Sequence, residues 1–179
     1  LASLMPIARY QDTKGILEVV KSKDPEAARK YIQQFWIQTS GMKAYDAWID
    51  YKKNVMIAEQ LYHTNFQDGF ETDRGRVFLQ YGRPNQITTR ESNPSEYPYE
   101  IWQYDAITKY HNKRFIFYNT DLVANNYRLL HSDMIGELQN RNWQHELVKR
   151  NTPNGTIDDP NANSMNGYGS NSNTYFRQF

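Results

Sequence analysis

Apolar residues in the first third of the chain recur at spacings of three and four, which is typical of amphipathic helices. The clearest stripe predicts a helix over Met42–Tyr62 and consists of Ala44, Trp48, Tyr51, Val55, Ala58 and Tyr62. A second helix is predicted over Pro25–Thr39, with Asp24 as its N-cap and a proline at the first helical position. Only Ser40-Gly41 separates these two, which favours a helical hairpin. A shorter helix that ends near Ser22 precedes them.

The middle of the chain changes to short runs of strand-forming residues. These runs predict strands over Arg76–Tyr81, Tyr99–Tyr104 and Arg114–Tyr118, and a short fourth strand over Tyr127–Leu130. The polar stretch Thr88–Ser95 is predicted as a loop. Because the links between the strands are short, an antiparallel meander is favoured over a parallel sheet, which needs long crossovers.

After the strands, a weak helix is predicted to open at Ser132 or Asp133, and Asn142 is predicted to cap another turn or two. Beyond Arg150, asparagine, glycine and serine dominate the sequence. A segment of this composition buries too little apolar surface to fold alone. It is predicted as an extended arm that lies against its own domain or a partner, with three aromatic anchors: Tyr175, Phe176 and Phe179.

These patterns predict an α+β fold. N-terminal helices are expected to pack on a small antiparallel meander sheet, followed by a C-terminal helix and the extended arm. The predicted organisation is a lead-in helix over residues 1–24, an α+β domain over residues 25–150 and the arm over residues 151–179.

Composition narrows the function classes. Of the 179 residues, 39% are apolar and 15% aromatic, so tyrosine, tryptophan and phenylalanine must supply much of the core. Trp36 and Trp48 lie on helical stripes and are assigned to that core. A net charge of +1 argues against a dedicated nucleic-acid surface, and the lack of cysteine excludes disulfides, thiol catalysis and cysteine zinc sites. No apolar run is long enough to span a membrane. The chain begins at Leu1 without a recognisable signal peptide, which fits a fragment or a processed product.

The densest motif is Gly69-Phe70-Glu71-Thr72-Asp73-Arg74-Gly75-Arg76. Together with Tyr81-Gly82-x-Pro84 and Tyr99-Glu100-Ile101-Trp102-x-Tyr104, it resembles the GWxTD domain family, with Phe70 at the tryptophan position. Later matches include Phe115-x-Phe117 and Tyr127–Ser132, so the resemblance covers roughly Pro25–Arg150. It implies an exported protein of Bacteroidota or related bacteria, located in the cell envelope as a periplasmic or outer-membrane-associated protein. It brings no established activity to the chain.

Physically, the motif is interpreted as a helix-to-strand junction. Gly69 would adopt a conformation forbidden to residues with a Cβ atom, and Thr72 and Asp73 would accept hydrogen bonds from nearby backbone N–H groups. Arg74 and Arg76 would share one face of the strand, where either could pair with Asp73. The favoured interpretation is a structural lock. The alternative is a ligand site in which the two arginines bind a carboxylate or phosphate.

Several partial motifs are rejected. Arg74–Tyr81 partly imitates an RNA-recognition strand but has arginine and valine at two key positions, so no nucleic-acid partner is expected. His131-Ser132-Asp133 has the residue types of a hydrolytic triad, but adjacent residues do not build one. Asp159-x-Asn161-x-Asn163 lacks the glycine and glutamate of a calcium loop. No catalytic residue, cofactor or metal site is predicted.

The favoured function is therefore non-enzymatic: a structural or protein-interaction module of the cell envelope that contacts another envelope protein through its C-terminal arm. A carbohydrate-binding module is the first alternative, and it requires Trp102 and Tyr104 to face solvent as a platform. A hydrolase acting through carboxylates around Asp73 and Glu100 is the second, and it requires a cleft with two close carboxylates.

Overall fold

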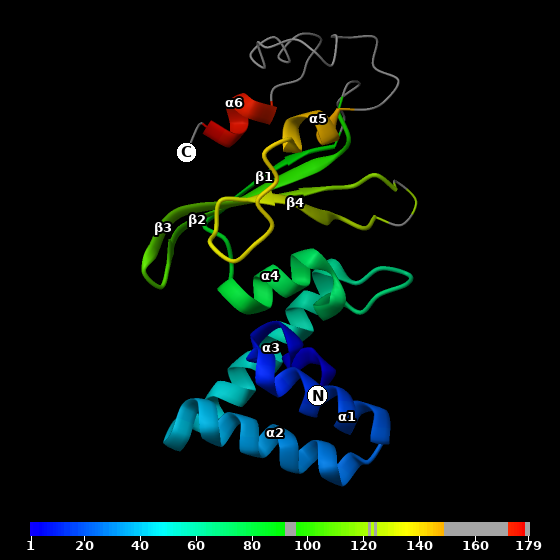
Figure 1. Ribbon diagram of the computed structural model, residues 1–179, viewed down its shortest axis with the longest axis vertical. Coiled ribbons are helices and arrows are strands. Elements are labelled where there is room, and N and C mark those ends of the chain that lie inside the picture. Colours follow the sequence, from blue (N-terminus) through cyan, green and yellow to red (C-terminus); the bar gives the residue numbers. More distant parts are fainter. Residues whose placement is uncertain (92–95, 122, 124, 149–171, 178–179) are drawn as a thin grey trace. The chain divides into compact units, whose positions relative to one another are not determined.

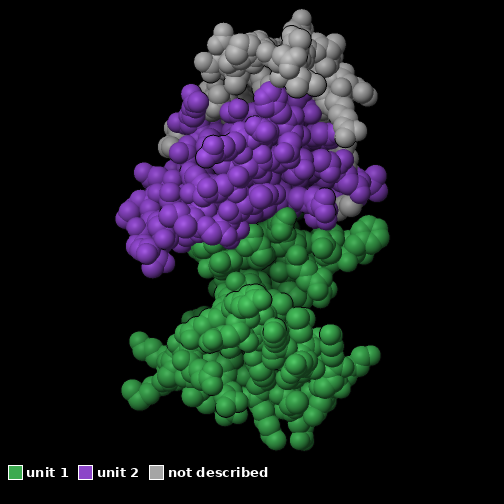
Figure 2. Space-filling model, in the orientation of Figure 1, with its two compact units in different colours: residues 1–82 green, residues 83–179 purple. Residues whose placement is uncertain are grey.

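The computed structural model describes residues 1–91, 96–121, 123, 125–148 and 172–177 (Figure 1). Helices come first along the chain and a four-stranded antiparallel sheet follows, which confirms the α+β class. The chain divides into two compact units, residues 1–82 and residues 83–179 (Figure 2). This boundary lies inside the single domain predicted over residues 25–150, and the two units are described in turn.

Unit 1 is helical. It contains the 3-10 helices η1 (Ala2–Ile7), η2 (Gly41–Lys43) and η3 (Gly69–Glu71), and the α-helices α1 (Tyr10–Ser22), α2 (Pro25–Ser40), α3 (Ala44–Tyr62) and α4 (Asp73–Tyr81). The three predicted helices are confirmed as α1, α2 and α3. Asp24 caps α2 as predicted, since its Oδ1 accepts a hydrogen bond of 2.9 Å from the N–H of Glu26. The 3-10 turns were not predicted.

Aromatic side chains supply much of the core of unit 1. Trp36 packs edge-to-face against Phe35 and in a tilted arrangement against Tyr51, with 5.4 Å between ring centroids in both pairs. The Tyr51 hydroxyl donates a hydrogen bond to the carbonyl oxygen of Ser3, which joins α3 to η1. Ala58 of the same α3 stripe is fully buried. The tilted and edge contacts match the preferred geometries of ring pairs.

The strand predicted over Arg76–Tyr81 is wrong, because the segment belongs to the helix α4. Thr72 is the N-cap of this helix, and its Oγ1 accepts a hydrogen bond of 3.1 Å from the N–H of Gly75. Val77 and Phe78 are buried one turn further along. The strand-forming residues are thus placed in a helix by a cap and by burial of one helical face, both of which override intrinsic propensity.

Unit 2 is built on a sheet with the strand order β1-β2-β3-β4, each pair antiparallel. The strands are β1 (Gln86–Arg90), β2 (Tyr99–Ile107), β3 (Tyr110–Tyr118) and β4 (Arg128–Ser132). The predicted meander is confirmed. The loop predicted from Thr88 is wrong as far as Arg90, because β1 occupies these positions. Its β-branched residues suit a strand, but as an edge strand it is mostly exposed and shows no apolar alternation.

Side chains of β2 alternate between the two faces of the sheet, and both faces carry buried aromatic residues. On one face, Tyr99 and Ile101 form a buried cluster with side chains of β3, β4 and a following helix: Ile116, Leu130, Trp143 and Leu147. On the other face, Trp102 packs against Phe117 with 4.8 Å between centroids, and Tyr104 packs against Phe115 at 5.4 Å.

The weak helix predicted at Ser132 or Asp133 is wrong. Both residues instead tie the end of β4 to β3: the Ser132 hydroxyl donates to the carbonyl oxygen of Arg114 at 2.8 Å, and Asp133 Oδ1 accepts from the N–H of Arg114 at 2.6 Å. Short polar side chains often compete with helix formation in this way. The turn contains Gly136 with a φ of 92°. The predicted helical turn after Asn142 is confirmed as α5 (Trp143–Leu147).

Most of the predicted C-terminal arm, including Phe179 and the candidate calcium loop, lies outside the described residues. Its described part, Ser172–Arg177, is the short helix α6 rather than an extended segment. Across the described parts of the chain, no helix combines the length and the apolar character needed to cross a membrane.

Candidate functional site

The glycines of the motif lie where backbones pack too closely for a side chain. A Cβ on Gly69 would collide with the carbonyl oxygen of Ala58 in α3, and a Cβ on Gly75 would collide with the carbonyl oxygen of Gly69, both well inside 3.0 Å. Neither glycine has a positive φ. The interpretation of Gly69 as a residue chosen for an unusual backbone conformation is therefore wrong, and close approach is the reason.

Hydrogen bonds fix the same junction. The buried Thr72 hydroxyl donates to the carbonyl oxygen of Gly69 at 2.8 Å and accepts from the N–H of Gly75. The N–H of Gly69 in turn donates to Glu59 Oε2 at 2.6 Å, which ties the turn to α3. The motif joins α3, η3 and α4 through backbone contacts and one threonine, and this supports its interpretation as a structural lock.

The two arginines of the motif do not share a face. In a helix, residues two apart project about 200° from each other, so the expectation from a strand fails. Arg74 is buried with its guanidinium carbon 5.3 Å from the ring centroid of Tyr62, whereas Arg76 donates to Gln80 Oε1 at 3.1 Å. Asp73 lies in the first turn of α4, where the helix dipole favours a carboxylate. Arg74 and Arg76 therefore do not form a pair that could bind one anion, as the ligand-site alternative requires.

The residues predicted as a sugar platform are buried. Trp102 is 0% exposed and Tyr104 is 1% exposed. The indole N–H of Trp102 donates to Glu100 Oε2 at 2.9 Å, so the polar end of the ring is used within the strand. These two side chains act as core and offer no face on which a sugar could stack.

The carboxylates named for hydrolysis are not brought together within one unit. Asp73 lies in unit 1 and Glu100 in unit 2. Among the described residues, no group of three or more histidine, aspartate or glutamate side chains could hold a metal ion. The part of the chain described by the structure therefore offers no observation in favour of the hydrolase.

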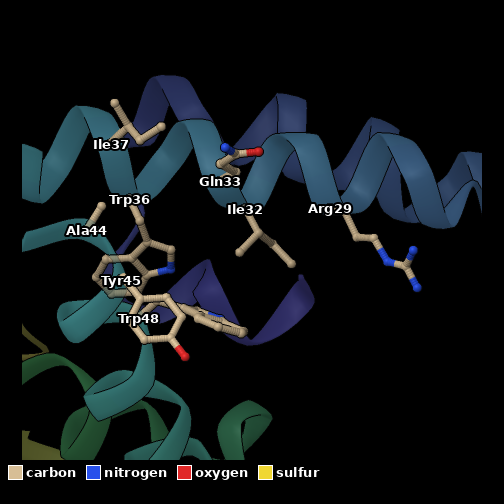
Figure 3. A pocket seen from close by; sticks show the side chains of 8 residues that line it. All are labelled: Arg29, Ile32, Gln33, Trp36, Ile37, Ala44, Tyr45 and Trp48. Carbon is tan, nitrogen blue, oxygen red and sulfur yellow. The ribbon is translucent and has the colours of Figure 1, made fainter.

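An apolar groove lies between α2 and α3, with a volume of about 440 Å³ (Figure 3). Its walls are Ile32, Trp36 and Ile37 from α2, and Tyr45 and Trp48 from α3. Tyr45 and Ile37 remain 69% and 52% exposed. The volume is in the range of ligand-binding clefts. Assignment of both tryptophans to the core was right for Trp36, but Trp48 is only partly buried.

Basic groups accompany the aromatic rings of this groove. Tyr45 and Trp48 lie 5.8 Å apart between centroids, and Lys52 Nζ lies 5.7 Å from the centroid of Trp48. Arg29 also lines the groove, and no acidic residue is among those that line it. The sequence carries no signal for this groove, because a helical stripe alone does not tell which of its aromatic residues are covered.

A second aromatic cluster holds α6 on the sheet of unit 2. The guanidinium carbon of Arg90 lies 4.0 Å from the ring centroid of Tyr175, and that of Arg114 lies 4.5 Å from the centroid of Phe176. Arg114 Nη1 also donates to the carbonyl oxygen of Phe176. Phe176 contacts Trp143 with 5.3 Å between centroids. The two predicted anchors Tyr175 and Phe176 are thus engaged within unit 2.

His131 belongs to this cluster. Its ring stacks on Trp143 at an interplanar angle of 15° and meets Phe176 edge-on. Burial lowers the pKa of His131, while Asp133 and a hydrogen bond to the backbone of Asn140 act in the opposite direction. Burial therefore favours the neutral form of the imidazole in the folded protein.

We expect the stability of unit 2 to fall as the pH is lowered from 7.5 to 5.5. Because the folded pKa of His131 lies below its unfolded value of about 6.5, the unfolded state binds more protons than the folded state as the pH falls. Protonation therefore favours unfolding. The substitution His131→Phe keeps a ring in the stack and removes the titration, so its Tm should vary less with pH. Equal pH slopes of Tm for the two proteins would contradict this assignment.

A family model described as the GWxTD domain matches residues 2–149 of the chain. No curated protein and no solved structure gives a match.

Proposed function

The chain belongs to the GWxTD domain family, and on this premise we propose that it is a non-enzymatic protein-interaction module of the bacterial cell envelope, a component of an outer-membrane or periplasmic assembly. The envelope setting rests on what the family resemblance implies. The interaction role rests on one observation, the exposed aromatic groove between α2 and α3.

The groove leaves apolar surface in water that a partner would cover. Ile37 and Tyr45 on its walls are more than half exposed, and Met42 in the adjoining turn is fully exposed. Covering apolar surface contributes about 25 cal/mol per Å². Tyrosine and tryptophan in such a position are the side chains that most often dominate binding energy at protein interfaces.

The charge of the groove indicates the chemistry of its partner. Arg29 and Lys52 lie about two helical turns from the η2 end of the hairpin, where Ile37 and Ala44 lie. We propose that the groove binds a helical segment with apolar side chains at i, i+3 and i+4 and an acidic residue at the end near Arg29. This is the helix-in-groove mode of recognition, with the carboxylate attracted by the basic groups.

The test is a pull-down from native envelope membranes with three forms of the full chain. They are the wild type, the double variant Ile37→Lys/Tyr45→Lys, which places two charges in the groove, and the control Leu61→Lys on α3 outside the groove. Leu61 is 55% exposed, so the control introduces a lysine at an apolar position of comparable exposure outside the groove. We expect a defined protein partner to bind the wild type and the control but at least tenfold less of it to bind the double variant.

Circular dichroism of all three forms checks that each is folded. If the double variant retains as much of the partner as the wild type does, the groove is not the contact surface. If no partner is retained by the wild type, the interaction role itself fails. The sequence predicts a partner contact through the C-terminal arm. Because Tyr175 and Phe176 of that arm pack within unit 2, we propose the groove as the contact surface instead.

A further inference from the structure

The helix α6 contacts the sheet of unit 2 through two side chains and one backbone oxygen, and these contacts indicate which groups this face can bind. Two adjacent rings, Tyr175 and Phe176, pack on the buried cluster of the sheet. Each ring lies against one guanidinium group, that of Arg90 or Arg114. Arg114 also binds the backbone carbonyl oxygen of Phe176. The recognition elements are therefore an adjacent aromatic pair and one carbonyl oxygen, which any short segment of the same chemistry can supply.

The helix α6 is short, and few of its side chains hold it on the sheet. The helix spans only Ser172–Arg177, and a helix this short is not stable in water by itself. Its order depends on the two aromatic side chains, and both remain partly exposed in the docked state. In the same chain, 24 residues separate it from the end of α5, so it competes with a separate segment as an intramolecular occupant of the face. A competing segment at higher affinity can therefore displace it.

We propose that this sheet face is a peptide-docking surface for a partner protein that presents two adjacent aromatic residues in a short helix, and that α6 is its displaceable occupant within the chain. The surface is separate from the groove in unit 1. It is carried by different observations and does not depend on the function proposed above.

The experiment uses the full chain and a fluorescein-labelled hexapeptide with the sequence of residues 172–177, Ser-Asn-Thr-Tyr-Phe-Arg, amidated at its C-terminus. Fluorescence anisotropy measures its binding to the wild type and to the variant Tyr175→Ala/Phe176→Ala, in which the internal competitor lacks its rings. We expect the variant to bind the peptide about tenfold more tightly, because in the wild type the face is already occupied by α6 of the same chain.

Two controls test the recognition chemistry. A peptide with alanine at both aromatic positions should not bind either protein. Adding Arg90→Gln to the variant should weaken binding at least threefold, because it removes the guanidinium that lies over Tyr175. Arg90 is preferred to Arg114 for this purpose, because the Arg114 guanidinium also lies 3.5 Å from Asp133 Oδ2, so its removal would break an ion pair at the end of β4.

Equal affinity of the peptide for the wild type and the variant would overturn the proposal, as would no binding up to 1 mM or no effect of Arg90→Gln. Sedimentation of the wild type supplies a further outcome. A concentration-dependent dimer that Phe176→Ala abolishes would assign the face to exchange of α6 between two copies of this chain, and that result would also overturn docking of a partner.

Discussion

Replacement of Gly75 by alanine is expected to lower the free energy of unfolding of unit 1 by at least ~3 kcal/mol, or to prevent its folding. The new Cβ would occupy the position of the Gly69 carbonyl oxygen, so η3 and the start of α4 would have to separate. Separation also breaks the two hydrogen bonds of the Thr72 hydroxyl. The higher helix propensity of alanine, about 1 kcal/mol, is too small to compensate. Urea denaturation followed by circular dichroism measures the change.

Gly15→Ala is the matched control, because it makes the same substitution inside a helix. A Cβ on Gly15 would meet the hydroxyl oxygen of Tyr31 at 2.9 Å, which is the far end of a side chain that can shift. We expect this variant to lie within about 1 kcal/mol of the wild type, since helix propensity and the displaced tyrosine oppose each other. If Gly75→Ala were equally mild, the close packing of the motif would be refuted.

This close packing explains why the motif contains glycine at positions 69 and 75, which the sequence alone did not explain. Gly69 lacks a side chain, so the turn η3 can pack against the backbone of α3. Gly75, six positions later, lacks one so that the start of α4 can pack against η3. Thr72, midway between them, bonds to both. Sequence reasoning placed a junction at this motif and predicted that Thr72 accepts a backbone hydrogen bond, but it expected a strand after the junction, whereas the helix α4 follows. It missed the contact between the glycines, because a contact across a turn leaves no periodic pattern.

The helices α2 and α3 and the central strands were predictable because their local sequence patterns agree with their burial. Stripes at three and four residues gave α2 and α3, and the proline and aspartate at the start of α2 fixed its beginning. Runs of strand-forming residues gave β2 and β3. In all of these elements, burial and local propensity favour the same structure, so the pattern in the sequence is unambiguous.

The wrong predictions concern segments in which local propensity and burial favour different structures, or in which one of the two gives no pattern. Arg76–Tyr81 has the composition of a strand, but the threonine cap and the burial of Val77 and Phe78 make it helical. β1 is an exposed edge strand, so it lacks the apolar alternation that identifies a strand. The candidate surfaces are harder still to predict. Whether Trp48 is covered, or Tyr175 packs on its own domain, depends on tertiary contacts that no local pattern encodes.

Replacement of Trp102 by alanine is expected to destabilise unit 2 by about 3–5 kcal/mol, the usual cost of truncating a large buried aromatic residue. The substitution removes a fully buried indole that packs against Phe117 and donates to Glu100. Trp102→Phe keeps a ring in the core and loses the hydrogen bond, so it should cost less than the alanine variant. Thermal unfolding of the full chain, monitored by near-ultraviolet circular dichroism, measures both changes.

Ile87→Ala provides the control, because Ile87 lies directly opposite Trp102 in the register of β1 and β2 but is 47% exposed. Truncation of an exposed cross-strand neighbour should cost no more than about 1 kcal/mol. The comparison also separates the two roles considered for Trp102. If Trp102 is a core residue, its truncation lowers the stability of the protein. If it is part of a sugar platform, its truncation abolishes glycan binding while the protein stays folded. If Trp102→Ala remained as stable as Ile87→Ala and lost binding in a glycan screen, the burial of this tryptophan would be wrong and the carbohydrate-binding alternative would regain its support.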